Sequence, residues 1–215
     1  MRPIKVWDLP VRLFHWVIVL LILVAWLTQE YNWMEWHVWT GCTILTLLLF
    51  RLVWGFIGSD TARFTRFLKG PVAALRHLSH IGRREADREI GHNAAGGWMV
   101  LLMLALIGVQ AGTGLFSNDD AATEGPLMHF VSKDQSDWLS HIHSINFKLI
   151  EAAIVLHVLA IAIYATLKRQ DLVRPMITGR KMLPDGTVAP RLVSSLLAAV
   201  TLMVAAGVVV WIVWL

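Results

Sequence analysis

The sequence predicts an all-α integral membrane protein, because its composition is strongly apolar and five long apolar runs cover most of it. The chain of 215 residues is 56% hydrophobic and 16% charged, whereas soluble proteins average about 45–50% apolar and 25% charged residues. A helix needs about 20 mainly apolar residues to cross the hydrocarbon core of a bilayer. Runs of that kind lie at residues 11–28, 36–57, 94–116, 143–167 and 192–215.

These runs divide the chain into three parts without a soluble domain. Residues 1–167 are expected to form a core of four membrane helices, residues 168–191 a cytoplasmic connector and residues 192–215 an extra transmembrane helix. The connector includes a turn-rich joint at residues 179–190. Between the second and third runs, residues 63–88 mix apolar and basic side chains, which predicts one amphipathic helix at the inner membrane surface.

The distribution of positive charge predicts the topology. Of 19 Lys and Arg residues, 3 lie at the start of the chain, 8 lie between Arg51 and Arg88, and 6 lie between Lys168 and Arg191. Short cytoplasmic loops collect Lys and Arg, so the N-terminus is expected to be cytoplasmic and the C-terminus outside. Anionic membrane lipid, and not nucleic acid, explains the basic composition. The outer loops are acidic, which fits either solvated loop charge or a docking face for a basic partner.

Two histidines of the fourth apolar run fall on one helix face. His143 and His157 are 14 residues apart, which is within about 40° of four full helical turns, and they stand about 21 Å apart along the axis. Polar residues inside a membrane span are costly and are functional candidates by default. His15 in the first run and His37 in the second offer one partner at each level, which gives two bis-histidine sites.

Three interpretations of these pairs remain open on spacing alone. Imidazoles can join neighbouring helices by hydrogen bonds. Zinc sites usually cluster three or four ligands and often include Cys, whereas the single Cys42 belongs to neither pair. Haem iron needs few protein ligands because the porphyrin supplies the others, so two haems fit the pattern best.

Several other polar residues are candidates with a plainer alternative. Arg51 follows His37 by 14 residues and either pairs with a haem propionate or snorkels to the interface. His92 begins the third run and either binds quinone, relays protons or caps the interface. The spacing of Lys148 and Glu151 allows an ion pair within one helix, or a proton or quinone role. His141 lies about 160° around the helix from His143, so it is not the expected ligand.

Four stretches of sequence resemble a known family. The opening Val-Trp-Asp-Leu-Pro-Val-Arg-Leu-Phe-His-Trp of residues 6–16, the His-Val-Trp-Thr-Gly of residues 37–41, residues 51–64 and the Gly-His-Asn of residues 91–93 are similar to the bacterial cytochrome b561 family, which includes the b-type subunit of nickel-iron hydrogenases. The spacing of His143 and His157 matches as well. The resemblance covers residues 6–167, so the last apolar run is not part of it.

The resemblance implies a four-helix core with two b-type haems in the bacterial inner membrane. By this resemblance His15 and His157 ligate the inner haem, and His37 and His143 ligate the outer haem. Members move electrons between the quinone pool and a periplasmic cytochrome c or another external redox partner, or they oxidise superoxide. Superoxide oxidation would need a cationic outer pocket, and the outer loops are mostly acidic. A transporter or scaffold with structural histidines is the alternative outside this class, and the sequence leaves room for a homodimer.

Overall fold

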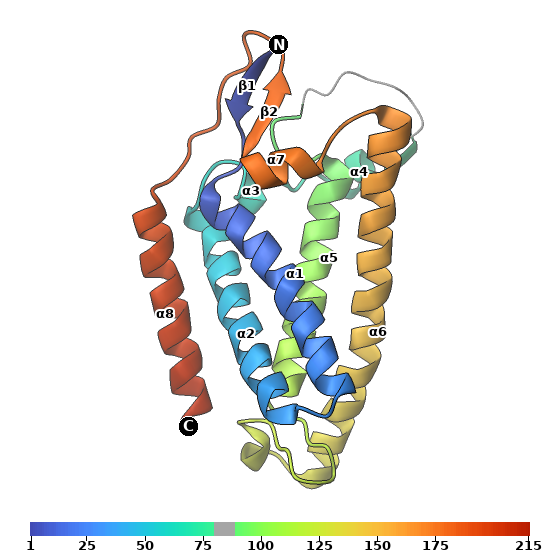
Figure 1. The fold of residues 1–215 in the computed structure, drawn as a ribbon, viewed down its shortest axis with the longest axis vertical. Coiled ribbons are helices and arrows are strands. Elements are labelled where there is room, and N and C mark those ends of the chain that lie inside the picture. The colour runs from blue at the N-terminus through green and yellow to red at the C-terminus, as the bar shows by residue number, and fades with distance from the viewer. Residues whose placement is uncertain (80–88) are drawn as a thin grey trace. The chain divides into compact units, whose positions relative to one another are not determined.

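The computed structural model describes residues 1–79 and 89–215, and the chain is 70% helical. Five helices are long and apolar enough to cross a membrane (Figure 1). They are α1 (Leu9–Glu30), α2 (Met34–Ile57), α5 (Ala94–Gly114), α6 (Lys133–Ile163) and α8 (Ser195–Val213). The π-helix η2 (Tyr164–Lys168) continues α6. The prediction of an all-α, multi-pass membrane protein is therefore confirmed.

Helix α6 begins ten residues before its apolar run. Its first turns carry polar side chains, and Ser136 and Ser140 bond to the preceding loop, with Ser136 Oγ donating to the Phe116 carbonyl over 2.7 Å. Hydropathy detects only the apolar part of a helix, so the predicted start of this helix at residue 143 was too late.

The single amphipathic helix expected over residues 63–88 is wrong for the part that the structure describes. Two short helices lie there, α3 (Phe64–Phe67) and α4 (Pro71–Ser79). The break falls at Leu68, whose φ and ψ are extended, and at the Gly70-Pro71 pair, since the ring of Pro71 disfavours a helical conformation in the residue before it. The rest of the predicted helix, at residues 80–88, lies outside the described residues.

A two-stranded antiparallel sheet was not predicted. Strand β1 (Arg2–Lys5) pairs with β2 (Arg180–Leu183), and Arg2 lies opposite Leu183. Helix α7 (Val173–Thr178) ends at Gly179, whose φ of 77° is in the left-handed region that glycine tolerates. The carbonyl of Gly179 accepts a hydrogen bond from the Val6 amide over 2.8 Å. The expected turn-rich joint therefore contains a strand that fastens the start of the chain.

The chain divides into two compact units. The first unit comprises Met1–Leu13, Leu52–Leu102 and Ala153–Ala198, and the second comprises Phe14–Arg51, Met103–Ala152 and Ala199–Leu215. Each of the five long helices contributes residues to both units.

Asp8 organises the core of the first unit. Its Oδ1 accepts a hydrogen bond of 2.8 Å from the Val11 amide in the first turn of α1, and its Oδ2 accepts one of 3.0 Å from Trp54 Nε1. Asp8 is 3% exposed and Trp54 is fully buried. A carboxylate that accepts hydrogen bonds from free amides at a helix start is a cap, so Asp8 caps α1.

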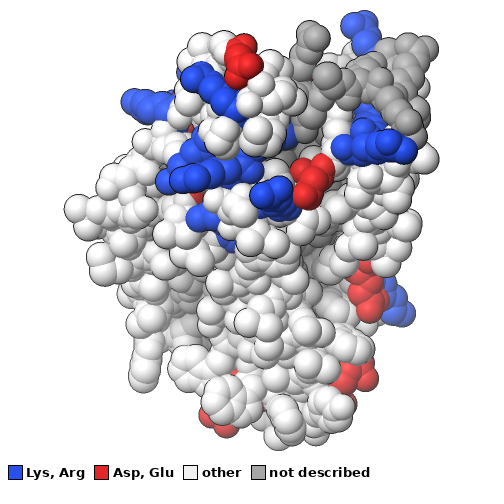
Figure 2. Space-filling model, turned by 45° about the horizontal axis from the view of Figure 1, so that its top comes forward, with Lys and Arg blue, Asp and Glu red and all other residues white. Residues whose placement is uncertain are grey.

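The two units carry opposite charge. Among the described residues, the first unit has 13 Lys and Arg against 5 Asp and Glu, and the second has 3 Lys and Arg against 8 Asp and Glu. Figure 2 shows, on one face, how the Lys and Arg side chains gather in one region. The charge asymmetry that predicted the topology is thus a property of the folded units as well as of the sequence.

Candidate functional site

The second unit contains a cavity of about 460 Å³. Side chains of α1, α2, α5 and α6 form its walls, together with the loop that follows α5. Its apolar lining includes Ile22, Ile44, Ile107, Phe147 and Ile150. Cofactor sites are typically concave, mostly apolar and of about 300–1,000 Å³, with a few placed polar groups. The polar groups of this cavity are therefore the candidates for chemistry.

Two predicted ligands, His37 on α2 and His143 on α6, face each other in this cavity. Their ring centroids are 6.1 Å apart and their planes are inclined by 75°. A bond from a metal ion to an imidazole nitrogen is about 2 Å long and that nitrogen lies about 1 Å from the ring centroid, so one ion between two rings needs centroids about 6 Å apart. The observed separation meets this requirement.

Each imidazole forms a hydrogen bond through Nδ1, which leaves Nε2 available to a metal. His37 Nδ1 lies 2.9 Å from the Ala25 carbonyl oxygen on α1, and His143 Nδ1 lies 2.9 Å from the Gln110 carbonyl oxygen on α5. A carbonyl only accepts hydrogen bonds, so each Nδ1 carries the proton and donates it. Each Nε2 then keeps its lone pair for a metal, which is the usual arrangement of ligating histidines.

A polar network behind His143 was missed by sequence reasoning. Asn146 is 4% exposed, and its Nδ2 donates to the Leu106 carbonyl over 2.9 Å and to Gln110 Oε1 over 2.7 Å. The hydroxyl of Thr113 lies 3.2 Å from His143 Nδ1. These contacts fix α5 against α6 at the level of the imidazole. The available signal was the presence of amide side chains inside apolar runs.

Two glycines of the cavity lining differ in their surroundings. A Cβ added at Gly114 would lie 3.0 Å from His143 Cε1, and one added at Gly41 would meet no atom within 4 Å. Gly97 of α5 serves packing instead. A Cβ on Gly97 would lie 2.9 Å from the Phe67 carbonyl oxygen, so this glycine allows close approach of the backbone.

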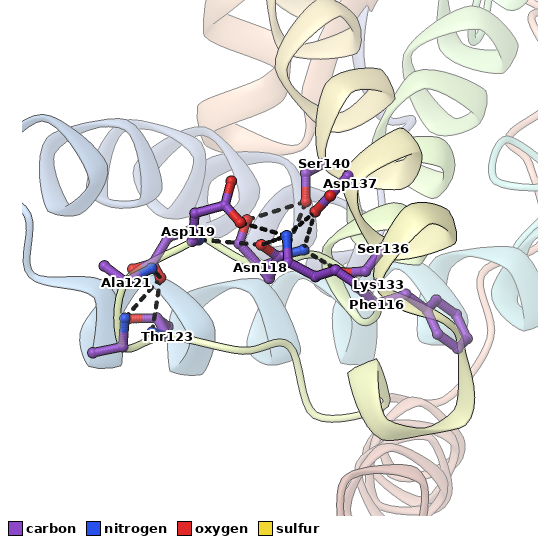
Figure 3. Close-up of polar contacts among 11 residues, drawn as sticks. Phe116, Asn118, Asp119, Ala121, Thr123, Lys133, Ser136, Asp137 and Ser140 are labelled. Carbon is purple, nitrogen blue, oxygen red and sulfur yellow. Dashed lines mark hydrogen bonds and ion pairs between the residues drawn. The ribbon is translucent and has the colours of Figure 1, made fainter.

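The loop after α5 contributes to the cavity lining and is fastened to α6 (Figure 3). Asn118 Nδ2 donates to Ser136 Oγ over 2.6 Å, and the Asn118 amide donates to Ser140 Oγ over 3.0 Å. Lys133 forms ion pairs with Asp120 and Asp137. These contacts hold the loop in place at the cavity.

Asp119 shapes the same loop from within. Its Oδ1 accepts hydrogen bonds from the amides of Ala121, Ala122 and Thr123, at 2.9, 3.0 and 2.9 Å. The bonds from Thr123 and then Ala121 are the main cause that lowers the pKa of Asp119 to about 2. The carboxylate therefore stays charged and bonded over the whole neutral range.

The other predicted ligand pair is not brought together within one unit. His15 lies on α1 in the second unit, with its ring edge to face against Trp16 at a centroid distance of 4.8 Å. His157 lies on α6 in the first unit. Their pairing stays a prediction.

Arg51 and His141 do not line the cavity. Arg51 is 2% exposed, which contradicts the alternative that its side chain snorkels to the membrane surface. His141 is exposed, whereas His143 lines the cavity. This arrangement agrees with the helical register that we used to choose between them.

His92 and His77 have defined surroundings in the first unit. His92 contacts two aromatic rings, with centroid distances of 4.7 Å to Trp7 and 4.7 Å to Phe67. His77 hydrogen-bonds to the hydroxyl of Tyr164, which also accepts a hydrogen bond of 2.8 Å from Asn93. His77 therefore has a specific hydrogen-bond partner and is not simply solvated.

Lys148 and Glu151 both line the cavity. The ion pair that their spacing suggested is absent, because none of the ion pairs among the described residues joins them. Structural pairing between these two side chains was the interpretation that we had favoured, and it is wrong.

The ligand set fits haem better than a bare metal ion. The described residues contain no group of three or more His, Cys, Asp or Glu that could hold a metal ion. Two facing imidazoles supply only two ligands, which suffices where a porphyrin supplies the other four. The open space at Gly41 leaves room for a bulky ligand in the same cavity. The residues present therefore fit a b-type haem.

Comparison with known proteins gives one family. The family model described as prokaryotic cytochrome b561 matches residues 6–179, which leaves β2 and α8 outside the match. No curated protein and no solved structure matches the chain. The match spans most of the chain and includes all four predicted ligands. The chain thus belongs to the prokaryotic cytochrome b561 family, and it is a membrane b-type cytochrome of electron transfer.

Proposed function

We propose that this cytochrome carries two haems and passes electrons between the membrane quinone pool and a redox partner outside the membrane. The observation that carries the proposal is the pair of facing imidazoles, His37 and His143, in a cavity of the second unit. When bound, haem b supplies a one-electron carrier whose potential its ligands and surroundings tune.

The residues around this pair would orient the ligands of a haem and shield it from water. His37 and His143 bind the iron, and their Nδ1 bonds to Ala25 and Gln110 fix ring orientation and raise the basicity of Nε2. The apolar walls and the fastened loop exclude water, and a low local dielectric limits the reorganisation that accompanies each electron.

His15 and His157 are the ligands that we propose for the second haem. Both lie in membrane helices. His157 follows His143 by 14 residues on α6, so it presents the same helix face about 21 Å further along the axis. Two carriers separated in this way divide the thickness of a bilayer into shorter electron-transfer steps.

The charges of the two units support an orientation in the bacterial inner membrane. The basic first unit, which contains the N-terminus, belongs on the cytoplasmic side by the positive-inside rule. The acidic loops that the sequence places outside would then suit a basic redox partner such as a periplasmic cytochrome c. The haem at His37 and His143 is the first to exchange electrons with that partner.

His92 is the residue that we propose for the quinone side. Its imidazole lies against Trp7 and Phe67, so a hydrogen-bonding and titratable group is surrounded by aromatic rings. A quinone headgroup is flat and has carbonyl oxygens, which such surroundings suit. Arg51, buried at the end of the second unit's α2 segment, is the proposed cation near the inner haem.

Superoxide oxidation is less well supported. Steering of an anion needs a cationic approach, whereas the charged residues that line the cavity are Glu30, Asp119, Glu151 and one cation, Lys148. The acidic lining favours exchange with a cationic protein over capture of a small anion.

Visible spectroscopy of the purified chain tests the proposal. We expect two haems per chain by pyridine haemochrome assay and protein quantification, and reduction of both by a short-chain quinol. His92→Phe, which keeps an aromatic ring and removes the imidazole, should retain both haems and slow this reduction at least tenfold. A chain without haem contradicts the whole proposal. A chain with one haem would contradict the proposed haem count alone. Unchanged quinol reduction in His92→Phe would contradict the proposed quinone site alone.

A further inference from the structure

The cavity of the second unit has a single cationic lining residue. Among the residues that line it, Lys148 on α6 is the only Lys or Arg, and the acids are Glu30, Asp119 and Glu151. Arg51, which the sequence offered as a partner for a haem propionate, is not among them. An anionic group bound in this cavity would therefore find one side chain of opposite charge.

Lys148 has no acidic partner among the described residues. None of the ion pairs and side-chain hydrogen bonds found among the described residues involves its ammonium group, although Glu151 follows it by three positions. The position lies within a membrane span, on α6, and its side chain is exposed while also lining the cavity. Ionisable residues in spans are expensive, face a cavity or the protein interior, and pair with an opposite charge. The structure thus presents a membrane lysine that lines a ligand cavity and has no counter-charge from the part of the chain that the structure describes.

We propose that the ammonium of Lys148 binds a propionate carboxylate of the haem held by His37 and His143. This inference rests on the proposed function, because it requires a haem at that pair. Haem b is the ligand that the cavity fits, and its propionates are its anionic groups. Without the haem, the Lys148 ammonium has no carboxylate partner among the described residues, and without Lys148 the propionate has no cationic partner in the cavity lining. The contact therefore gives each group a partner of opposite charge.

Lys148 and His143 lie on different sides of α6 but line one cavity. Lys148 follows His143 by five residues, which is a rise of about 7.5 Å along the axis and a rotation of about 140° around it. Both residues line the same cavity. The flexible four-carbon stem of lysine lets its ammonium meet a carboxylate at the edge of a macrocycle, whereas His143 binds at the centre. The contact would orient the haem as well as hold it.

The test compares haem b with its dimethyl ester, in which the propionates are uncharged. The full chain carrying His157→Ala, which should hold only the haem of this cavity, is loaded with either form. Transfer to a haem acceptor protein then gives the dissociation rate by absorbance. We expect esterification to speed dissociation about tenfold or more, because the ester cannot form the charge-assisted contact with Lys148.

The variants decide whether Lys148 causes the difference. In Lys148→Met the two haem forms should dissociate at the same rate, close to that of the ester in the parent chain, and Lys148→Arg should restore most of the difference. Lys69→Met removes a lysine outside the cavity lining and should behave as the parent chain. An undiminished ester effect in Lys148→Met would overturn the inference. A parent chain whose haem is not bound at His37 and His143 would instead refute the proposed function.

Discussion

His37 and His143 lie on different helices, yet their imidazoles meet in one cavity with centroids 6.1 Å apart, and each is anchored to a backbone carbonyl of a further helix. Four helices therefore contribute to one pair of ligands. Each anchor removes a rotational freedom of the ring, so the pair is oriented before iron is bound.

Loss of either imidazole should abolish the same haem. We expect His37→Ala and His143→Ala each to remove one of the two haems and the same set of reduced absorption bands, because axial ligation needs both rings. Redox potentiometry with optical detection measures this. His141→Ala, whose side chain is exposed on the same helix, is the control and should keep both haems. If His141→Ala lost haem and His143→Ala did not, the assigned register of α6 would be wrong.

Two neighbouring glycines of α5 should differ sharply on substitution. Gly114→Ala places a methyl group 3.0 Å from His143 Cε1, so the imidazole must move and the adjacent haem should shift its potential or dissociate faster. Gly112→Ala meets no atom within 4 Å and serves as the matched control. Potentiometry and dissociation rates of the two variants give the comparison. Equal behaviour of the two variants would argue against the close contact at Gly114.

Asp8 should be the most sensitive polar residue of the first unit. Asp8→Ala removes the cap of α1 and leaves Trp54 Nε1 buried without this acceptor. We expect a loss of about 2–4 kcal/mol in the free energy of unfolding, from a lost cap of about 1 kcal/mol and an unsatisfied donor of about 1–3 kcal/mol. Denaturant titration in detergent measures it. In a double-mutant cycle, the cost of Asp8→Ala should fall when Trp54 is already Phe.

The turn at Asp119 should be insensitive to pH until strongly acidic conditions. Its pKa is lowered to about 2 by the bonds from Thr123 and Ala121, compared with about 3.9 in an unfolded chain. A lowered pKa contributes stability above the unfolded value, and that contribution is lost as pH falls through the folded value. Hydrogen exchange of residues 117–126 should show faster exchange in Asp119→Ala than in the parent chain at pH 6. The difference should shrink towards pH 2, and a constant difference would contradict this origin.

Reporter fusions test the predicted orientation. The basic first unit is expected on the cytoplasmic side, and five spans then place the other end of the chain outside. A reporter inserted after Ser79 should report the cytoplasm, and one fused after Leu215 should report the periplasm. Reports from one side for both positions would contradict either the orientation or the number of spans.

The sequence predicted the features that follow from apolar length and residue spacing. It did not predict those that depend on a single contact between residues far apart in the sequence. The five spans follow from apolar length, and the approach of His37 and His143 follows from their positions in two of these spans. The Nδ1 anchors could not be predicted, because every residue has a carbonyl and only packing decides that those of Ala25 and Gln110 face an imidazole.

The errors have physical causes as well. Strands β1 and β2 have four residues each, and their partners are far apart in the chain, so neither carries a recognisable pattern. The spacing of Lys148 and Glu151 allowed an ion pair, but spacing cannot tell whether two side chains turn towards each other or towards a cavity. Asn146 was overlooked because one amide in an apolar run has no periodicity of its own.

The pairing of β1 with β2 has a consequence for how the protein is made. The partner of Arg2–Lys5 is Arg180–Leu183, so the first strand leaves the ribosome long before its partner exists. At about 5–20 residues per second, the wait is roughly 10 to 40 s. During that time α1, α2, α5 and α6 are all synthesised and delivered to the membrane while the edge of β1 stays unpaired. Completion of the first unit is therefore a late step of biogenesis, and it follows insertion of the helices that carry the ligands.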